Sequence, residues 1–227
     1  MAPIDINNQE INSITLNGST EIDTVTVNGQ VVFSPSIKID FESGSLSSLN
    51  LPQNWTFVFE GPSGDTRIQS GTVLDGNHSL ECDSSNNRDR GIKIIPDSPI
   101  QPNEIRYLVR ANSRNGQNGQ GNRFFLERNG NYLISQDLED DGSVEAQLVG
   151  RSLSNGWSTN VTYQWRIYNI DYSNNLYDID FRNYDNDTLV ETETNIPFKT
   201  NASSIDAIRL IKNGGNSPGY YDLLEIE

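Results

Sequence analysis

Short runs in which apolar and polar residues alternate are the feature of this sequence that most limits its fold. In YQWRIY, residues 163–168, the large apolar side chains of Tyr163, Trp165 and Ile167 alternate with those of Gln164, Arg166 and Tyr168. YDIDFR, residues 177–182, repeats the pattern. Successive side chains of a strand point to opposite faces. These runs therefore predict strands with one buried face and one solvent-facing face.

Runs of this kind recur between clusters of Asn, Gly, Asp, Ser and Pro, and almost no stretch shows a helical period. We therefore predict an all-β fold, a two-sheet antiparallel jelly-roll sandwich spanning residues 37–227. The predicted strands are 37–41, 55–59, 66–69, 79–82, 92–95, 105–111, 123–127, 131–136, 144–149, 163–170, 176–183, 188–192, 206–211 and 220–226. The predicted core includes Phe41, Trp165, Ile167, Tyr177, Ile179, Phe181, Ile208 and Leu210.

The first 36 residues carry nearly the same phrase twice, ITLNG and then VTVNG. Asn-Gly between alternating β-formers is a strong hairpin signal, because a type I′ turn needs positive φ at both central residues. The stretch predicts a small β-meander with strands at 13–16, 20–27 and 30–33, and Ser34-Pro35-Ser36 reads as a linker. These strands either begin the main domain or form a separate attachment module over residues 1–36.

The attachment module is too small to build a core of its own, and isolated hairpins are marginal in water. Its strands either pack on the main domain or pair with strands of neighbouring copies or other proteins. The linker and the repeated phrase favour the second solution, a symmetric homo-oligomer, with a trimer expected and a pentamer as the alternative. The side chains expected to make this contact are Ile14, Leu16, Val25, Val27, Val31 and Phe33.

An excess of acidic residues limits the partners of the chain. Its 31 Asp and Glu against 16 Lys and Arg give a net charge of -15, which repels nucleic acid and anionic membranes. The N-terminus has no secretion-signal pattern and no apolar run is long enough to span a bilayer, so we expect no membrane insertion. Arg outnumbers Lys twelve to four. This bias favours a protein of high-salt surroundings over an ordinary acidic protein.

Common catalytic arrangements are missing from the sequence. His78 is the single histidine, and no Gly-x-Ser-x-Gly elbow accompanies it. With one histidine and one cysteine, Cys82, a zinc site is not expected, and no intrachain disulfide can form. Glu191 and Glu193 would share one strand face but have no third carboxylate. We therefore expect no enzyme.

Five phrases from residue 37 onward resemble those of concanavalin A-like lectin and glucanase jelly rolls, including laminin-G-like modules. They are IDFESG at 39–44, LDGNHSLE at 74–81, WRI at 165–167, NLYDID at 175–180 and GYYDLLEI at 219–226. The glucanases of this group carry Glu-x-Asp-x-x-Glu on one strand. Thr26 breaks that pattern after Glu21, and Val144 breaks it after Glu139. The resemblance therefore implies the fold without hydrolysis.

The N-terminal hairpin phrases resemble the virion-proximal ends of tailed-virus fibre, spike and capsid-decoration (turret) proteins. With the acidic bias, this resemblance implies a non-enzymatic structural protein on the virion surface of a virus of halophilic archaea. Such a protein would contact other virion proteins through residues 1–36 and display an outward jelly roll that binds host-surface glycan. The alternative is a secreted carbohydrate-binding module or weak glycoside hydrolase.

The resemblance to the concanavalin A-like jelly rolls also implies a structural calcium ion that ties the opening of the domain to its last strand. Glu42 and Asp222 stand at the matching positions, and oxygen ligands suit this hard ion. The alternative is that both are ordinary strand-end carboxylates.

The solvent-facing side of the predicted strands offers a surface for a ligand or partner. Arginines, carboxylates and aromatic rings there have the chemistry of a glycan site. The alternative is a solvated face whose ion pairs contribute little. The residues expected on this surface are Arg106, Arg110, Trp157, Gln164, Arg166, Tyr168, Asp178, Asp180, Arg182 and Arg209.

Overall fold

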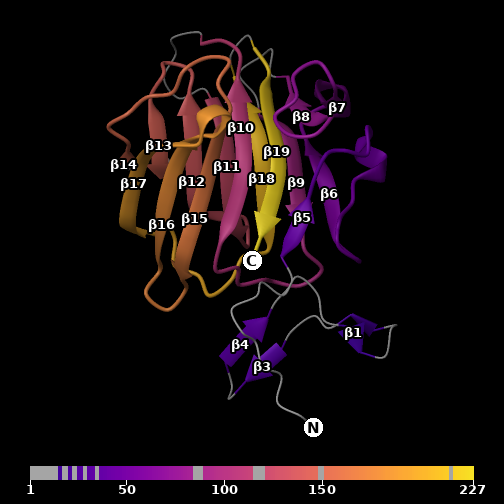
Figure 1. Cartoon of the computed structure of the whole chain (residues 1–227), viewed down its shortest axis with the longest axis vertical. Coiled ribbons are helices and arrows are strands. Elements are labelled where there is room, and N and C mark those ends of the chain that lie inside the picture. The colour runs from indigo at the N-terminus through magenta and orange to yellow at the C-terminus, as the bar shows by residue number, and fades with distance from the viewer. Residues whose placement is uncertain are drawn as a thin grey trace.

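A computed structural model describes residues 36–83, 89–114, 121–147, 151–214 and 217–227, together with the backbone of four short strands that precede them (Figure 1). β1 (Thr15–Leu16) pairs with β2 (Thr20–Glu21), and β3 (Val25–Val27) pairs with β4 (Gln30–Phe33), all antiparallel. Both predicted Asn-Gly hairpins are therefore paired. β2 and β3 lie within the predicted strand 20–27, of which residues 22–24 lie outside the described residues. The contacts predicted for Ile14, Leu16, Val25, Val27, Val31 and Phe33 also lie outside the described residues and side chains.

The front sheet of the main domain has eight strands (Figure 1). From one edge to the other they are β17 (Thr188–Pro197), β16 (Leu176–Asn183), β15 (Tyr163–Asp171), β10 (Ile105–Ala111), β19 (Gly219–Ile226), β8 (Ser79–Cys82) and β7 (Thr66–Gln69). The eighth strand, β5 (Ile37–Ile39), pairs with the end of β19. All pairs are antiparallel.

The back sheet has seven antiparallel strands. In spatial order they are β14 (Arg151–Ser152), β13 (Val144–Gln147), β12 (Asn131–Glu139), β11 (Gly121–Arg128), β18 (Ala207–Asn213), β9 (Asp89–Ile95) and β6 (Thr56–Glu60). This all-β two-sheet sandwich confirms the predicted jelly roll. Three short 3-10 turns, η1 (Leu46–Ser48), η2 (Ser63–Asp65) and η3 (Tyr184–Asn186), complete the described elements. None of the helices in the described residues is long and apolar enough to cross a membrane.

The predicted strand positions are close to those of the structure. β7, β8, β10 and β16 have the predicted bounds, and each other predicted strand of the main domain overlaps an observed one. The main differences are that β9 begins at Asp89, β12 runs on to Glu139 and β17 runs on to Pro197, and that the two-residue strand β14 was not expected. β17 continues through polar residues because it is an edge strand that pairs with β16 alone in the front sheet.

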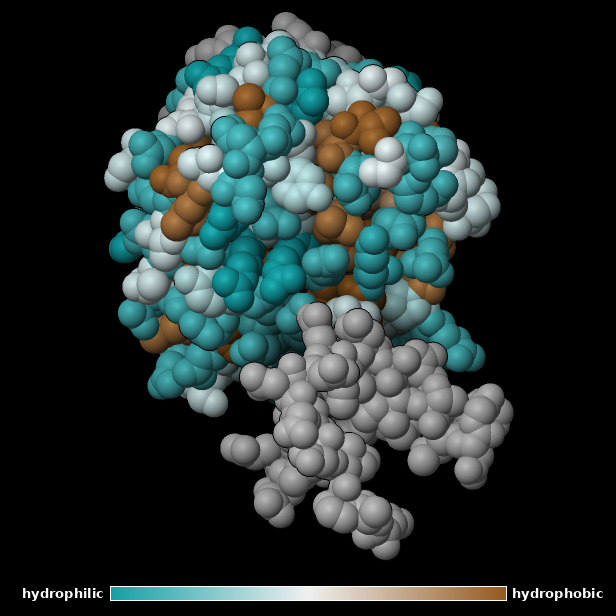
Figure 2. All heavy atoms as spheres, viewed as in Figure 1, coloured by the Kyte–Doolittle hydropathy of each residue, from teal (hydrophilic) through white to brown (hydrophobic). Residues whose placement is uncertain are grey.

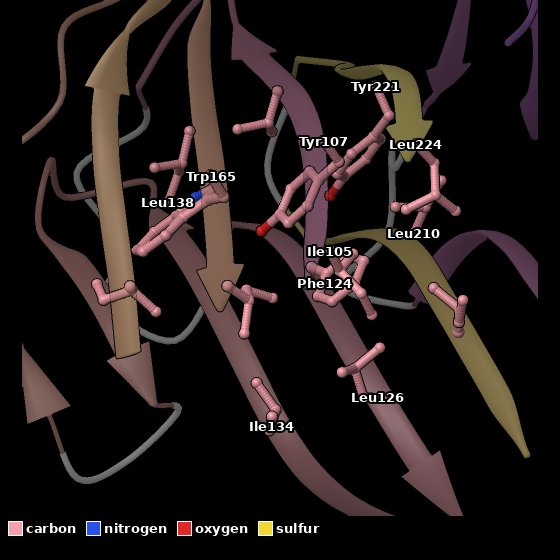
Figure 3. Close-up of a cluster of buried hydrophobic side chains, with 14 of the residues drawn as sticks. Ile105, Tyr107, Phe124, Leu126, Ile134, Leu138, Trp165, Leu210, Tyr221 and Leu224 are labelled. Carbon is pink, nitrogen blue, oxygen red and sulfur yellow. The ribbon is translucent and has the colours of Figure 1, made fainter. Parts of the chain in front are cut away.

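The core lies between the two sheets, where aromatic and aliphatic side chains of both inner faces meet (Figure 3). The rings of Tyr107 on β10 and Phe124 on β11 stack across the interface with centroids 4.3 Å apart. Burial of each such side chain stabilises the fold by about 1.5–3 kcal/mol. All eight predicted core residues are at most 1% exposed. Period-2 alternation therefore assigned the buried faces correctly.

Two buried tyrosines also join the sheets through hydrogen bonds. The hydroxyl of Tyr177 on β16 donates to the carbonyl oxygen of Ala146 on β13 at 2.7 Å. The hydroxyl of Tyr221 on β19 contacts the carbonyl oxygens of Ile211 and Arg123 on the back sheet. A buried hydroxyl without a partner is costly, so these bonds allow polar groups inside the sandwich.

Candidate ligand-binding face

The outer face of the front sheet brings together eight of the ten predicted surface residues. Arg106 on β10 lies opposite Arg166 on β15, which lies opposite Asp180 on β16. Hydrophilic side chains gather over these three strands (Figure 2). We call this surface the ligand face; its predicted members are Arg106, Arg110, Gln164, Arg166, Tyr168, Asp178, Asp180 and Arg182.

An ion-pair network runs across the middle of the ligand face. The guanidinium of Arg166 donates to both carboxylate oxygens of Glu104, at 2.9 and 2.7 Å, and lies 3.7 Å from Asp180. Arg106 contacts the same Glu104 and also Glu225. Burial disfavours the charge of Glu104, but the two arginines outweigh it and hold its pKa below the usual value. The network fixes the side chains of the face in one arrangement.

An aromatic ring lies beside this network. The guanidinium carbon of Arg166 lies 4.4 Å from the ring centroid of Tyr168, a cation–π geometry. Burial, together with the nearby carboxylates of Asp180 and Asp178, raises the pKa of Tyr168. The hydroxyl therefore stays protonated at neutral pH and can donate a hydrogen bond.

The remainder of the face, over β19 and β8, is covered by a loop that we call the strap, residues 70–78. Leu74 of the strap packs on Leu108 and Tyr220. The strap is tied at two points by carboxylates. Asp222 accepts the backbone N–H of Asp75 at 3.1 Å. Glu42 accepts the backbone N–H groups of residues 77 and 78 at 3.0–3.2 Å.

These two carboxylates are the predicted calcium ligands, and their surroundings do not favour an ion. Both oxygens of Asp222 accept backbone N–H groups, from Asp75 and from Leu223, and both oxygens of Glu42 accept N–H groups from Asn77. Within the described residues, no group of three or more acidic, histidine or cysteine side chains could hold a metal ion. The residues present do not fit calcium, and the site stays a prediction that the geometry does not support.

Two predicted members of the surface are placed elsewhere. Trp157 lies on a loop, as expected, but it is 1% exposed, because its Nε1 donates to the carbonyl oxygen of Glu139 at 2.7 Å and Arg114 lies over its ring. Arg209 lies on the back sheet and is 7% exposed. Asp180 belongs to the face but is buried, and its carboxylate accepts a hydrogen bond from the hydroxyl of Thr192 and forms an ion pair with Arg166.

The burial of Arg209 follows from neighbours distant in sequence. Its guanidinium contacts Glu127, Glu60 and Asp89 at 3.1–3.2 Å and the hydroxyl of Tyr132 at 2.7 Å. These charged partners outweigh the burial that would lower its pKa, so the pKa of Arg209 is raised and the group stays charged. Arg209 therefore holds the back sheet together and takes no part in the ligand face.

The carboxylates considered for hydrolysis have structural partners. Glu191 accepts the backbone N–H groups of Ser154 and Asn155, at 3.0 and 2.9 Å, and Glu193 pairs with Arg151. These contacts join the edge strands β17 and β14, closing one side of the sandwich. His78 sits in the turn before β8, where its backbone N–H donates to Glu42. None of these three residues belongs to the ligand face.

Sequence reasoning missed three residues near the face. Glu104 precedes β10, and Asp75 and Tyr184 lie in turns, where no periodicity marks them. Burial and the carboxylates of Asp75, Glu225 and Asp222 raise the pKa of Tyr184. No signal in the sequence would have found these residues, because their role depends on the packing of separate elements.

The arrangement of the domain is similar to that of lectins and of a polysaccharide lyase. The lectin I-B4 of Griffonia simplicifolia, in a metal-free form, superposes with a TM-score of 0.55 at 10% identity, over 86% of this chain and 99% of the lectin. Lectin II of Ulex europaeus gives 0.53 at 9% identity, over 84% and 97%. The alginate lyase Aly36B gives 0.50 at 15% identity, over 85% and 96%.

Identities this low show a shared fold alone. The domain has the concanavalin A-like jelly-roll fold, which lectins and polysaccharide lyases share. No protein-family model matches the sequence, and no curated protein matches it.

Proposed function

We propose that the domain is a non-enzymatic carbohydrate-binding module whose ligand face binds an uncharged glycan. The observation that carries this proposal is the half-buried set of planar polar groups beside Tyr168, in which Arg166 and Arg106 are both held by Glu104. Preorganised planar hydrogen-bonding groups next to an aromatic ring suit the alternating hydroxyls and C–H faces of a sugar.

The charge of the face favours an uncharged glycan over a polyuronate. Arg106, Arg166 and Arg182 each already contact a carboxylate, and Arg110 donates to the amide oxygen of Asn112. An anionic polymer would have to compete with these partners on a chain of net charge -15.

The absence of catalysis is part of the proposal. Asp222 has a pKa of about 7, suitable for a general base, but it is 2% exposed and both its oxygens accept backbone N–H groups beneath the strap. Incubation with panels of β-glucans and polyuronates is expected to give no turnover. Turnover that Asp222→Asn abolishes would contradict this part.

Binding is tested on a glycan array with the wild type, Arg166→Ala and Tyr168→Ala. Both variants should lose most of the signal for uncharged glycans. Arg128→Ala is the matched control, because Arg128 is a half-buried, ion-paired arginine on the back sheet. Signal lost in the control, or kept in both face variants, would contradict the proposal, and so would an array on which no uncharged glycan binds.

The virion setting expected from the N-terminal hairpins stays a prediction. Neither the fold nor the lectin and lyase neighbours support it. The presence of the protein in purified particles, detected by antibody, would support this setting. Detection only in the culture fluid would favour the secreted module.

A further inference from the structure

A polar hollow of about 600 Å³ lies at the hairpin that joins β15 and β16, at one end of the ligand face. This size is within the range of small-molecule sites. The lining contains four apolar or aromatic side chains suited to a sugar C–H face, and no Lys, Arg or His is among the described residues that line it. The lining residues are Gln101, Asn103, Asn169, Ile170, Asp171, Tyr172, Ser173, Leu176, Tyr177, Asp178 and Asn195.

Two β-bulges shape this hollow. The register between β15 and β16 shifts between Tyr168 and Asp171, and the register between β16 and β17 shifts between Tyr177 and Ile179. Asn169 and Asn195 adopt left-handed φ values of 51° and 55° at these shifts. Asn tolerates this backbone better than most residues. Bulges re-aim side chains and are frequent beside binding sites.

The two acidic residues of the lining are used to hold its walls. Asp178 accepts the side-chain N–H of Asn169 at 2.8 Å and the backbone N–H of Asn195 at 2.7 Å. Asp171 accepts the backbone N–H groups of Ser173 and Asn174 at 2.8 and 3.0 Å. These hydrogen bonds hold the walls of the hollow together, and its two carboxylates carry negative charge with no cationic side chain among the described lining residues.

Two side-chain amides of the lining have no hydrogen-bond partner among the described residues. The backbone of Asn103 bonds to Glu227 and Ile170, and the backbone N–H of Asn195 donates to Asp178, but neither side chain forms a hydrogen bond with a described residue. Both residues are exposed. An amide presents a donor and an acceptor side by side, which matches two neighbouring hydroxyls of a pyranose ring.

We propose that this hollow is a subsite for one uncharged pyranose residue at the end of a glycan that lies on the ligand face. This inference rests on the proposed function and adds to it the position that binds the terminal sugar. Asn103 and Asn195 bond its hydroxyls, and the face continues into the hollow because Asp178 lies opposite Tyr168. Asp171 and Asp178 exclude sugars that carry a carboxylate, since like charges repel.

The experiment uses saturation-transfer NMR on the full chain. The probes are the methyl glycosides of glucose, galactose, mannose and N-acetylglucosamine, with methyl glucuronide and methyl galacturonide as charged counterparts. At least one uncharged glycoside should bind, and neither uronide should. The double variant Asn103→Ala/Asn195→Gly should bind that glycoside about tenfold more weakly, since two hydrogen bonds are lost. Glycine keeps the left-handed backbone at position 195.

Asn160→Gly is the control, because Asn160 is also exposed and left-handed, at φ 61°, but lies outside the hollow. Asp178→Asn should allow a uronide to bind. Unchanged affinity in the double variant, equal loss in the control, or uronide binding to the wild type would overturn the subsite. If Arg166→Ala abolishes glycan binding while the double variant binds as the wild type does, the subsite is wrong and the proposed function stands. Absence of binding by every glycoside and every array glycan refutes both.

Discussion

The backbone amide of Asp75 donates a hydrogen bond of 3.1 Å to Oδ2 of Asp222, joining residues 147 positions apart. This bond holds the strap against the front sheet, beside the packing of Leu74 on Leu108 and Tyr220. Burial, with smaller effects from the charges of Asp75 and Glu42, raises the pKa of Asp222 to about 7. The folded protein therefore favours the protonated form of Asp222, the side chain that holds the strap.

Asp222→Asn tests this relationship through the pH dependence of stability. An unfolded Asp ionises near pH 4, and the folded Asp222 near pH 7, so the folded state holds the proton more tightly. The stabilisation that comes from the raised pKa of Asp222 is therefore fully present below about pH 4, and it is lost as the pH rises to about 7. Melting curves from acid to alkaline pH should show a smaller decline for the variant. Parallel curves for both proteins would contradict the raised pKa.

Glu42→Ala should loosen the strap without involving calcium. The backbone N–H of Asn77 is the main cause of the lowered pKa of Glu42, and the variant removes the acceptor of that bond. Hydrogen exchange of the amides of residues 77 and 78 should accelerate. A chelator at constant ionic strength should leave the wild-type melting temperature unchanged. If the chelator lowers it, and the effect disappears in Glu42→Ala, calcium binds here after all.

Two tyrosine hydroxyls form a matched pair for the energetics of the core. Tyr177→Phe removes the donor to Ala146 across the sandwich, and the free energy of unfolding should fall by about 1 kcal/mol. The hydroxyl of Tyr172 is also buried but has no partner among the described residues. Tyr172→Phe should therefore leave that free energy unchanged or raise it. Urea denaturation measures both, and a larger loss in Tyr172→Phe would contradict the assignment.

The fold was predictable because one-dimensional alternation decides which face of a strand is buried, as Trp165 and Ile208 illustrate. The same pattern assigned Arg209 to the outer face of its strand, and its side chain does lie on the other face of β18 from those of Ile208 and Leu210. It could not show that Glu60, Asp89 and Glu127 would enclose the guanidinium, because they lie on three other strands or strand ends. Alternation also assumes unbroken strands. Alternation therefore could not predict the bulges at Asn169 and Asn195 or the hollow beside them.

The charge excess predicts a salt-dependent stability. With a net charge of -15, repulsion between surface carboxylates is unscreened at low ionic strength. Buried pairs such as Lys212 and Asp140 are screened much less and should change little. The melting temperature should fall on dialysis from molar to millimolar KCl. NaCl should act as KCl does if screening is the cause, and a melting temperature independent of salt would refute the prediction.

A chain that begins at Ser36 tests the separate role of the N-terminal hairpins. The main domain starts with β5, which pairs with the end of β19 through Ile39 and Leu224, both fully buried in the core. The described core therefore closes with residues from Ile37 onward. We expect the shortened chain to be folded and monomeric, with the melting temperature and glycan binding of the full chain, while the full chain forms oligomers. Light scattering measures the mass of both. An unfolded shortened chain, or one that still assembles like the full chain, would show that the hairpins belong to the domain.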